Sequence, residues 1–220
     1  MLNKFQIYGE RCSGTNLVNA LISGSSFYHN GRTPVFPNLK PTSEFGHKHW
    51  IGHKTKQILE EGSDTLFIGI VRHPYDWIIS FFRKKHHLPP PLRNFNGFLH
   101  HEWYSVGNGQ EIPMDRFWKT GDRFVNIFEL REEKLKYLYY VMPKIAPNYI
   151  FIKYEDLCAN LSSFINQVSL KTGHEPQKTD IHIKLSTYPF DMRIAKAVNS
   201  GIAWDIENAV GYKKKFIPPS

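Results

Sequence analysis

Short runs of apolar residues alternate along the chain with stretches in which apolar residues recur every three or four positions. Residues 65–71 (TLFIGIV) form the clearest run, and a nearly unbroken apolar run is typical of a strand in a parallel sheet that is covered on both faces. Residues 5–8 and 149–154 are shorter runs of the same kind. The pattern therefore predicts three buried strands, of which 65–71 is central.

Helical spacing follows most of these runs. It predicts helices at residues 16–22, 76–85, 130–142, between Asn160 and Gly173, and at 204–210. Pro143 is expected to end the third of these, and Gly211 is expected to cap the last. Strands that alternate with helices predict the α/β class, here a three-layer sandwich around a central parallel sheet.

The composition favours a folded, enzyme-sized protein. Of the 220 residues, 41% are hydrophobic and 22% charged, which excludes collagen-like, coiled-coil and wholly disordered chains. Residues 86–123 are rich in proline, glycine and aromatic residues, a composition that resists regular structure. We therefore expect one domain over residues 1–220 with a loop-rich insertion at about 86–123.

The net charge indicates which ligands the protein favours, and the cysteine content bears on disulfides and metal sites. With 28 Lys and Arg against 20 Asp and Glu, the net charge is +8, which favours anionic ligands. Cys12 and Cys158 are too few for a disulfide framework, and no metal-ligand spacing is present, so no metal is expected. No apolar segment is long enough for a signal peptide or membrane anchor, and the predicted location is the cytoplasm.

The segment 9–16 (GERCSGTN) joins the first predicted strand to the first predicted helix. Backbone amides at such a junction converge on an anion, and the helix dipole adds positive potential there. The spacing imitates the GxxxxG of nucleotide-binding P-loops, but Thr15 stands where those loops carry lysine. The segment predicts a phosphate or sulfate cradle, with a tight turn that binds nothing as the alternative. The candidate residues are Arg11, Cys12, Ser13, Gly14, Thr15 and Asn16.

Two further segments carry candidate chemistry. Arg72 follows the central strand directly and Ser80 lies on the helix after it, so both are candidates for a second anion site. A solvated strand end is the alternative. Residues 47–49 (HKH) offer a general base, His49 or else His47, and Lys48 offers a positive charge for a developing anion. The alternatives for this segment are a solvated basic turn and an adventitious metal site.

Four segments together resemble the sulfotransferases that use 3′-phosphoadenosine 5′-phosphosulfate (PAPS) as donor. They are residues 11–16 (RCSGTN), 72–80 (RHPYDWIIS), 149–157 (YIFIKYEDL) and 198–212. The resemblance implies a P-loop-like fold in which 11–16 holds the 5′-phosphosulfate and Arg72 with Ser80 holds the 3′-phosphate. Arg193, upstream of the fourth segment, is a further candidate for the 3′-phosphate.

The first loop departs from the family pattern. The basic residue that usually adjoins the Ser/Thr-Gly pair is replaced by Cys12, with Arg11 one position earlier. We expect Arg11 to reach the transferring sulfuryl group across that extra position.

The sequence therefore predicts a PAPS-dependent sulfotransferase acting on an acceptor hydroxyl or amine, in a carbohydrate or small molecule, without a metal. PAPS is a co-substrate and leaves as adenosine 3′,5′-bisphosphate (PAP). A P-loop-type nucleotide kinase, a basic nucleic-acid-binding protein and a catalytically silent family member remain alternatives, although no specific nucleic-acid-binding signature is present. The sequence does not identify the acceptor or the oligomeric state.

Overall fold

The computed structural model describes residues 1–24, 33–85, 87–177, 183 and 185–216. The chain divides into two compact units. Unit 1 comprises residues 1–72 and 138–186, and unit 2 comprises residues 73–137 and 187–220. Each unit is described by itself.

Unit 1 is built on a parallel sheet of four strands in the order β2-β1-β3-β6. The strands are β1 (Lys4–Gly9), β2 (Lys40–Pro41), β3 (Thr65–Val71) and β6 (Tyr149–Lys153). β1 pairs with β3 from Lys4↔Thr65 to Gly9↔Ile70, and β3 pairs with β6 as far as Val71↔Lys153. This register brings the carboxyl ends of the three longer strands to one edge of the sheet.

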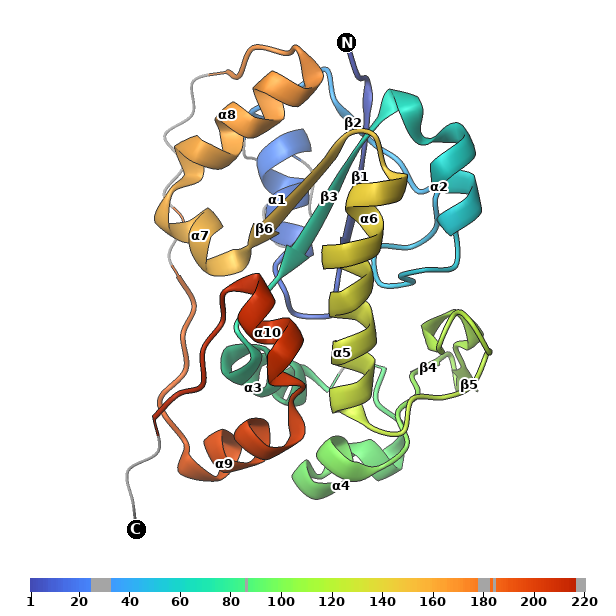
Figure 1. The fold of residues 1–220 in the computed structure, drawn as a ribbon, viewed down its shortest axis with the longest axis vertical. Coiled ribbons are helices and arrows are strands. Elements are labelled where there is room, and N and C mark those ends of the chain that lie inside the picture. The colour runs from blue at the N-terminus through green and yellow to red at the C-terminus, as the bar shows by residue number, and fades with distance from the viewer. Residues whose placement is uncertain (25–32, 86, 178–182, 184, 217–220) are drawn as a thin grey trace. The chain divides into compact units, whose positions relative to one another are not determined.

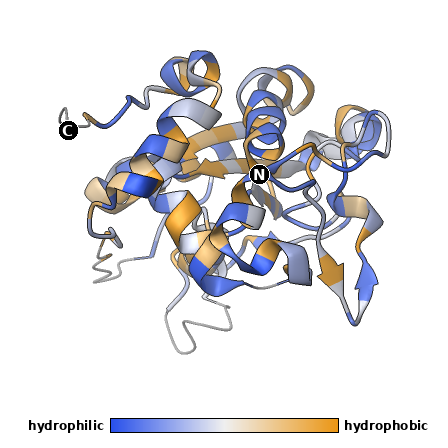
Figure 2. Cartoon of the chain, turned by 90° about the horizontal axis from the view of Figure 1, so that it is seen from below, coloured by the Kyte–Doolittle hydropathy of each residue, from blue (hydrophilic) through white to orange (hydrophobic). Residues whose placement is uncertain are grey.

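One face of the sheet is covered by α1 (Thr15–Ser23) and α8 (Leu161–Thr172) (Figure 1). Alternate strand residues point to this face, including Ile7, Ile68 and Ile152, and they share one buried apolar cluster with Val18 of α1 and Val168 of α8. In Figure 2 the strands of the sheet are strongly hydrophobic whereas the helices carry both colours, as expected for a sheet buried on both sides.

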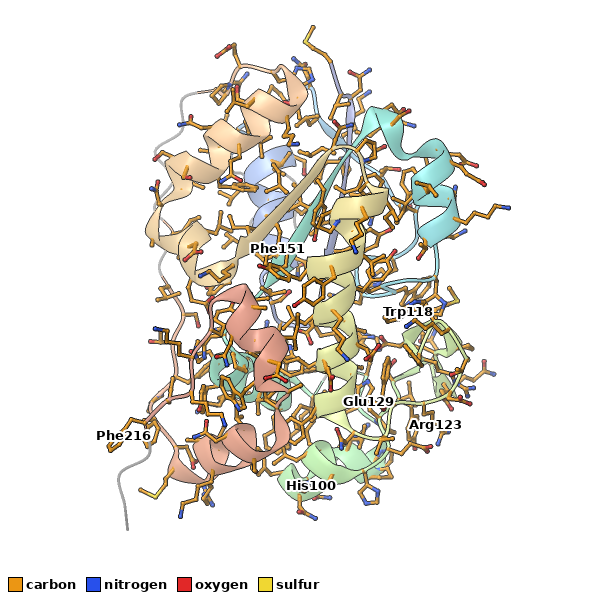
Figure 3. The ribbon with its side chains drawn as sticks, in the orientation of Figure 1. His100, Trp118, Arg123, Glu129, Phe151 and Phe216 are labelled. Atoms are coloured by element: carbon orange, nitrogen blue, oxygen red, sulfur yellow. The ribbon has the colours of Figure 1, made fainter. Side chains whose placement is uncertain are left out.

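The other face carries α2 (Thr55–Glu61) and α6 (Met142–Ile145) (Figure 1). Phe151 of β6, labelled in Figure 3, meets the ring of Tyr139 at a centroid distance of 5.3 Å. Gly69 leaves the space that the Tyr149 hydroxyl occupies, because a Cβ built there would lie 1.9 Å from that oxygen. Helices on both faces confirm the three-layer α/β sandwich.

The remaining elements of unit 1 are short: η1 (Gly62–Asp64) follows α2, and α7 (Tyr154–Ala159) begins directly after β6.

Unit 2 is mainly helical. Its elements are α3 (Pro74–Lys84), η2 (Pro90–Arg93), α4 (Phe95–His100), β4 (Val106–Gly107), β5 (Gln110–Glu111), η3 (Pro113–Asp115), α5 (Ile127–Lys136), α9 (Met192–Gly201) and α10 (Trp204–Val210).

Two buried ion pairs lie inside unit 2. Arg131 of α5 binds Glu207 of α10 with Nε–Oε1 at 2.5 Å and Nη2–Oε2 at 2.9 Å, and both side chains are 1% exposed. Lys134, one turn further along α5, binds Asp115 at 2.9 Å. The Asp115 carboxylate also accepts from the Ser105 hydroxyl at 2.7 Å.

The helix predicted over residues 130–142 does not end at Pro143. After α5 the chain forms a π-helical segment, η4 (Tyr137–Val141), and then α6, in whose first turn Pro143 lies. A proline lacks the N–H that an inner helical position needs, but the first turn of a helix leaves its amides without intrahelical acceptors. The change of helical period therefore lets the helix continue past the proline.

The prediction of one domain with an insertion stays a prediction. The described part of the insertion, residues 87–123, contains only short elements, from η2 to η3, and residue 86 lies outside the described residues. Among the helices that the structure describes, none has both the length and the hydropathy needed to cross a membrane.

Candidate active site

The carboxyl ends of β1 and β3 form the centre of the candidate site. From β1 the chain leads through α1 to β2 at one edge of the sheet, whereas the chain after β3 returns to the sheet at β6, on the opposite side. Adjacent strands whose connections diverge in this way mark a switch point, where ligands of α/β proteins bind. The loop after β1 and Arg72, directly after β3, both lie at this position.

The loop between β1 and α1 is a tight turn. Ser13 donates from both its N–H and its hydroxyl to the Glu10 carbonyl, at 3.2 and 2.7 Å. Gly14 precedes the helix at φ 110°, and a Cβ there would lie 2.8 Å from the Tyr154 ring. Cys12 has φ 66°, a value that is uncommon for a residue with a side chain. The turn leaves the amides of Thr15 and Asn16 in the first turn of α1, where an anion can accept from them.

Arg72 lies against this loop. Its Nη1 donates to the Cys12 carbonyl at 3.4 Å, and its Nη2 donates to the Ser186 carbonyl. The guanidinium carbon is 4.8 Å from the centre of the Tyr154 ring, a cation–π distance. Arg72 is 5% exposed, so its positive charge is fixed in position beside the loop.

A second positive group reaches the loop from residues 47–49. The Gly9 N–H donates to the Lys48 carbonyl at 3.0 Å, and the Lys48 ammonium donates to Asn16 Oδ1. Burial, together with the nearby charge of Arg11, lowers the pKa of Lys48 below its ordinary value. No ion pair with a carboxylate is found for Lys48 in the described part of the chain. An anion bound near Arg11 and Lys48 would relieve their mutual repulsion.

The two candidate bases differ in their hydrogen bonds. His49, which is buried, has Nδ1 2.7 Å from the Gly9 carbonyl. A carbonyl only accepts, so this contact assigns the proton to Nδ1 and the lone pair to Nε2. In His47, Nδ1 accepts from the His49 N–H at 3.4 Å, which occupies the lone pair of that ring. The two rings therefore differ in the nitrogen that carries the proton, and the choice of His49 or else His47 as a base stays a prediction.

The other candidates belong to unit 2. Ser80 is buried in α3, at 2% exposed. Arg193, near the start of α9, has a side chain that is 89% exposed and pairs with Asp191 at 3.2 Å. The structure therefore brings together the candidates of residues 11–16, 47–49 and Arg72, all within unit 1.

His73 is a further feature of unit 2 that the sequence did not single out. Its ring stacks on Tyr75 at 5.2 Å and meets the edge of Tyr212 at 5.1 Å. Burial lowers the pKa of His73 to about 4, and the charge of Lys215 acts in the same direction. The folded state therefore holds His73 neutral.

We expect this group to make stability depend on pH. The unfolded chain takes up the His73 proton near pH 6.5 and the folded chain only near pH 4. The stabilisation is therefore complete above pH 6.5 and is lost as the pH falls towards 4, by up to about 3 kcal/mol. Urea unfolding at a series of pH values checks this against His73→Gln. If the variant shows the same loss between pH 6.5 and 4 as the parent, His73 is not the group responsible.

The sequence did not predict a role for two residues that lie in or against the loop. Tyr154 supports both Arg72 and Gly14, and a signal for it was available, since it follows a strand whose carboxyl end lies at the same sheet edge. Glu10 is a carboxylate only 1% exposed within the loop, and no spacing rule pointed to it. In the described part of the chain no group of three or more His, Cys, Asp and Glu side chains could hold a metal ion.

Comparisons with known proteins give a likeness among solved structures alone. No protein-family model matches the chain, and no curated protein matches it. Among solved structures, the chain is similar to mouse sulfotransferase SULT7A1 complexed with PAP, with 14% sequence identity and a TM-score of 0.38. The alignment covers 98% of this chain and 70% of the mouse chain. At that TM-score the likeness implies nothing about the activity of this chain.

Proposed function

We propose that the chain is a sulfotransferase that takes the sulfuryl group from PAPS and passes it to an acceptor. The donor is a substrate that leaves as PAP. The proposal is supported by residues of unit 1: a strand-to-helix loop with first-turn amides, and three cationic side chains, Arg11, Lys48 and Arg72, around it.

The single observation that carries the proposal is the position of Arg72 beside the loop. Arg72 comes from the end of β3, and its guanidinium reaches the Cys12 carbonyl at 3.4 Å. A donor with anionic groups at both the 3′ and the 5′ positions of its ribose suits cationic groups from two strand ends, and the β1 and β3 ends supply them. That Ser80 and Arg193 also bind the 3′-phosphate stays a prediction from the sequence.

The residues of the loop segment and of residues 47–49 take separate roles in this proposal. The amides of Thr15 and Asn16 bind the 5′-phosphosulfate, together with the loop residues Ser13 and Gly14. Lys48 and Arg11 stabilise the charge that develops on the sulfuryl oxygens and on the leaving phosphate. His49 accepts the proton of the acceptor at Nε2, because the Gly9 carbonyl holds the other nitrogen protonated.

A nucleotide kinase is less well supported. Kinases with a P-loop use a lysine at the position where this chain has Thr15, and that lysine reaches the β- and γ-phosphates. Lys48 comes from a different segment and binds Asn16 of the first helical turn. Its position suits a charge at the 5′ end of the donor.

Ligand-dependent thermal stability tests the proposal before any acceptor is known. A ligand that binds only the native state raises the melting temperature, so PAP at saturating concentration is expected to raise it by several degrees. ATP with magnesium is expected to raise it less. A larger shift with ATP would favour a kinase, and a shift with an oligonucleotide but not with PAP would favour nucleic-acid binding; either outcome overturns the proposal.

A further inference from the structure

A cavity of about 240 Å³ lies beside β1 in unit 1. β2 pairs with β1 only at Lys4 and Phe5, after which the Thr42 N–H donates to the Phe5 carbonyl at 3.0 Å. The chain rejoins β1 at Lys48, whose carbonyl accepts from Gly9. Residues 42–48, here called the arch, span the edge of β1 between these two contacts. The arch, β1 and α1 all contribute residues to the cavity, which we call the arch cavity.

Gln6 lines this cavity and has a buried oxygen without a donor. Its Nε2 lies 3.2 Å from both the Ile7 and the Gly46 carbonyls. Both partners are acceptors, so the amide nitrogen must be on that side and Oε1 on the other. Gln6 is 3% exposed, and its Oε1 has no hydrogen-bond partner among the residues that the structure describes. Buried acceptors in proteins are normally paired, so Oε1 is an exception within the wall of the cavity. It is shielded from solvent, so a molecule in the cavity does not reach it unless the wall moves.

The rest of the lining suits a compact ring that carries hydroxyl groups. Hydroxyls come from Thr15, Thr42 and Ser43, and the Thr42 oxygen accepts from the Glu44 N–H at 3.2 Å, which leaves its proton to donate. Hydroxyl side chains both donate and accept, as the hydroxyls of a polyol do.

Apolar surface comes from Phe5, Ile7 and Pro41. Such surface suits the C–H face of a ring. The volume is several times that of one water, roughly 30 Å³. It is below the roughly 300–1,000 Å³ of sites for drug-sized ligands. A molecule of about monosaccharide size fits these limits.

The charge of the lining selects among such molecules. Lys48 lines the cavity, and Arg11 is close enough to influence it. None of the described lining residues is a carboxylate. An amine that is protonated at neutral pH would add a third positive charge to this region without a counter-charge, whereas a neutral hydroxyl compound adds none.

We propose that the arch cavity holds the sulfuryl acceptor, and that this acceptor is a small, neutral, polyhydroxylated ring with one hydroxyl bound to the hydroxyls of Thr42 and Ser43. This inference rests on the proposed sulfuryl transfer, and it selects a hydroxyl acceptor over an amine. His47 and Lys48 line the cavity, so a second hydroxyl of the ring faces the transfer site at that end.

The transfer itself then follows a simple displacement. The oxygen of the second hydroxyl forms a bond to sulfur while the bond from sulfur to the phosphate oxygen of the donor breaks. The hydroxyl proton passes to Nε2 of His49. The products are the sulfate ester of the ring and PAP.

Binding of sugars without any donor present tests the inference directly. The probes are myo-inositol, glucose and galactose, with glucosamine as the positively charged counterpart, each followed by ligand-observed NMR. We expect saturable binding of at least one neutral probe, and binding of glucosamine at least about tenfold weaker than glucose. Radiolabelled PAPS should then transfer its sulfur to the probe that binds.

Two variants locate the binding. Ser43→Leu adds bulk to the exposed rim of the arch cavity and is expected to weaken probe binding by about tenfold or more. Ser162, on α8, is exposed as Ser43 is, so Ser162→Leu is the matched control and should leave probe binding unchanged.

The outcomes separate this inference from the proposed function. Saturable, Ser43-sensitive binding of a neutral probe, together with a PAP-induced thermal shift and sulfur transfer, supports both. If PAP stabilises the protein but no neutral probe binds, or if glucosamine binds more tightly than glucose, the acceptor inference is overturned and the donor assignment stands. If a probe binds and PAP does not, the cavity is a polyol site and the sulfotransferase proposal fails, and with it the acceptor role.

Discussion

Replacing Arg131 with alanine is expected to lower the free energy of unfolding by about 3–5 kcal/mol. The guanidinium is buried, binds Glu207 through two nitrogens, and lies 4.8 Å from the centre of the Trp77 ring. Without Arg131, the Glu207 carboxylate stays buried without its counter-charge. Solvation of that charge is lost on folding and nothing replaces it, so the cost greatly exceeds that of losing a surface pair.

Urea unfolding measures this effect, with Lys136→Ala as the matched control on the same helix. Lys136 pairs with Glu132 at 2.6 Å, but its side chain is 43% exposed, and exposed pairs contribute about 0–1 kcal/mol. Replacing both partners, as Arg131→Met with Glu207→Leu, should recover much of the loss because no charge is then buried. A loss for Arg131→Ala no larger than for Lys136→Ala would contradict the prediction.

Lys48→Met is expected to weaken binding of PAPS by about tenfold or more and to lower turnover by about 10²–10³-fold. The side chain of methionine has nearly the length of lysine without the charge. In the free protein, Lys48 is half-buried and close to the charge of Arg11, which lowers its pKa. Removing the charge relieves that repulsion, so the melting temperature of the free variant should not fall.

Calorimetric titration of PAPS and PAP, combined with thermal unfolding, separates these two effects. Lys56→Met is the matched control, because Lys56 lies on α2 with an 86% exposed side chain and only a distant ion pair, at 3.8 Å, with Glu60. Its donor affinity should equal that of the parent. Unchanged donor affinity in Lys48→Met would refute the role of Lys48. A fall in melting temperature would show that Lys48 stabilises the fold instead.

The elements that the sequence predicted well are those whose signal is local. The apolar run 65–71 matches β3 residue for residue, because a strand covered on both faces needs apolar side chains at every position. Asn160 caps α8 by accepting from the Ser163 N–H at 3.0 Å, and Gly173 ends that helix at φ 74°. Both caps follow from the chemistry of a single residue.

The elements that were missed depend on distant contacts. β2 is only two residues long and pairs with β1 36 positions away in the sequence, so no local pattern marks it. Helices α2 and α4 are short, and the apolar positions within them are too few to establish a period. Helix α9 does carry apolar residues at helical spacing, with Ala195 and Val198 buried, so a local signal was present there and was not used. The continuation past Pro143 required a π-helical turn, which no periodicity rule anticipates.

The same distinction holds for the candidate site. The loop and Arg72 were predicted because strand ends and glycine spacing are visible in sequence. The tautomer of His49 depends on the Gly9 carbonyl, 40 residues away. The unsatisfied oxygen of Gln6 depends on the Gly46 carbonyl. Such features arise only when the chain has folded.

The arch also has a consequence for the behaviour of the protein at high concentration. β3 covers one edge of β1, but β2 covers the other edge only at Lys4 and Phe5. An open strand edge is a template on which another chain can add a strand and start an aggregate. The hydrogen bonds at Thr42 and Lys48 hold the arch across that edge. Another molecule therefore cannot add a strand at the outer edge of β1. The arch protects this edge of the sheet against intermolecular association.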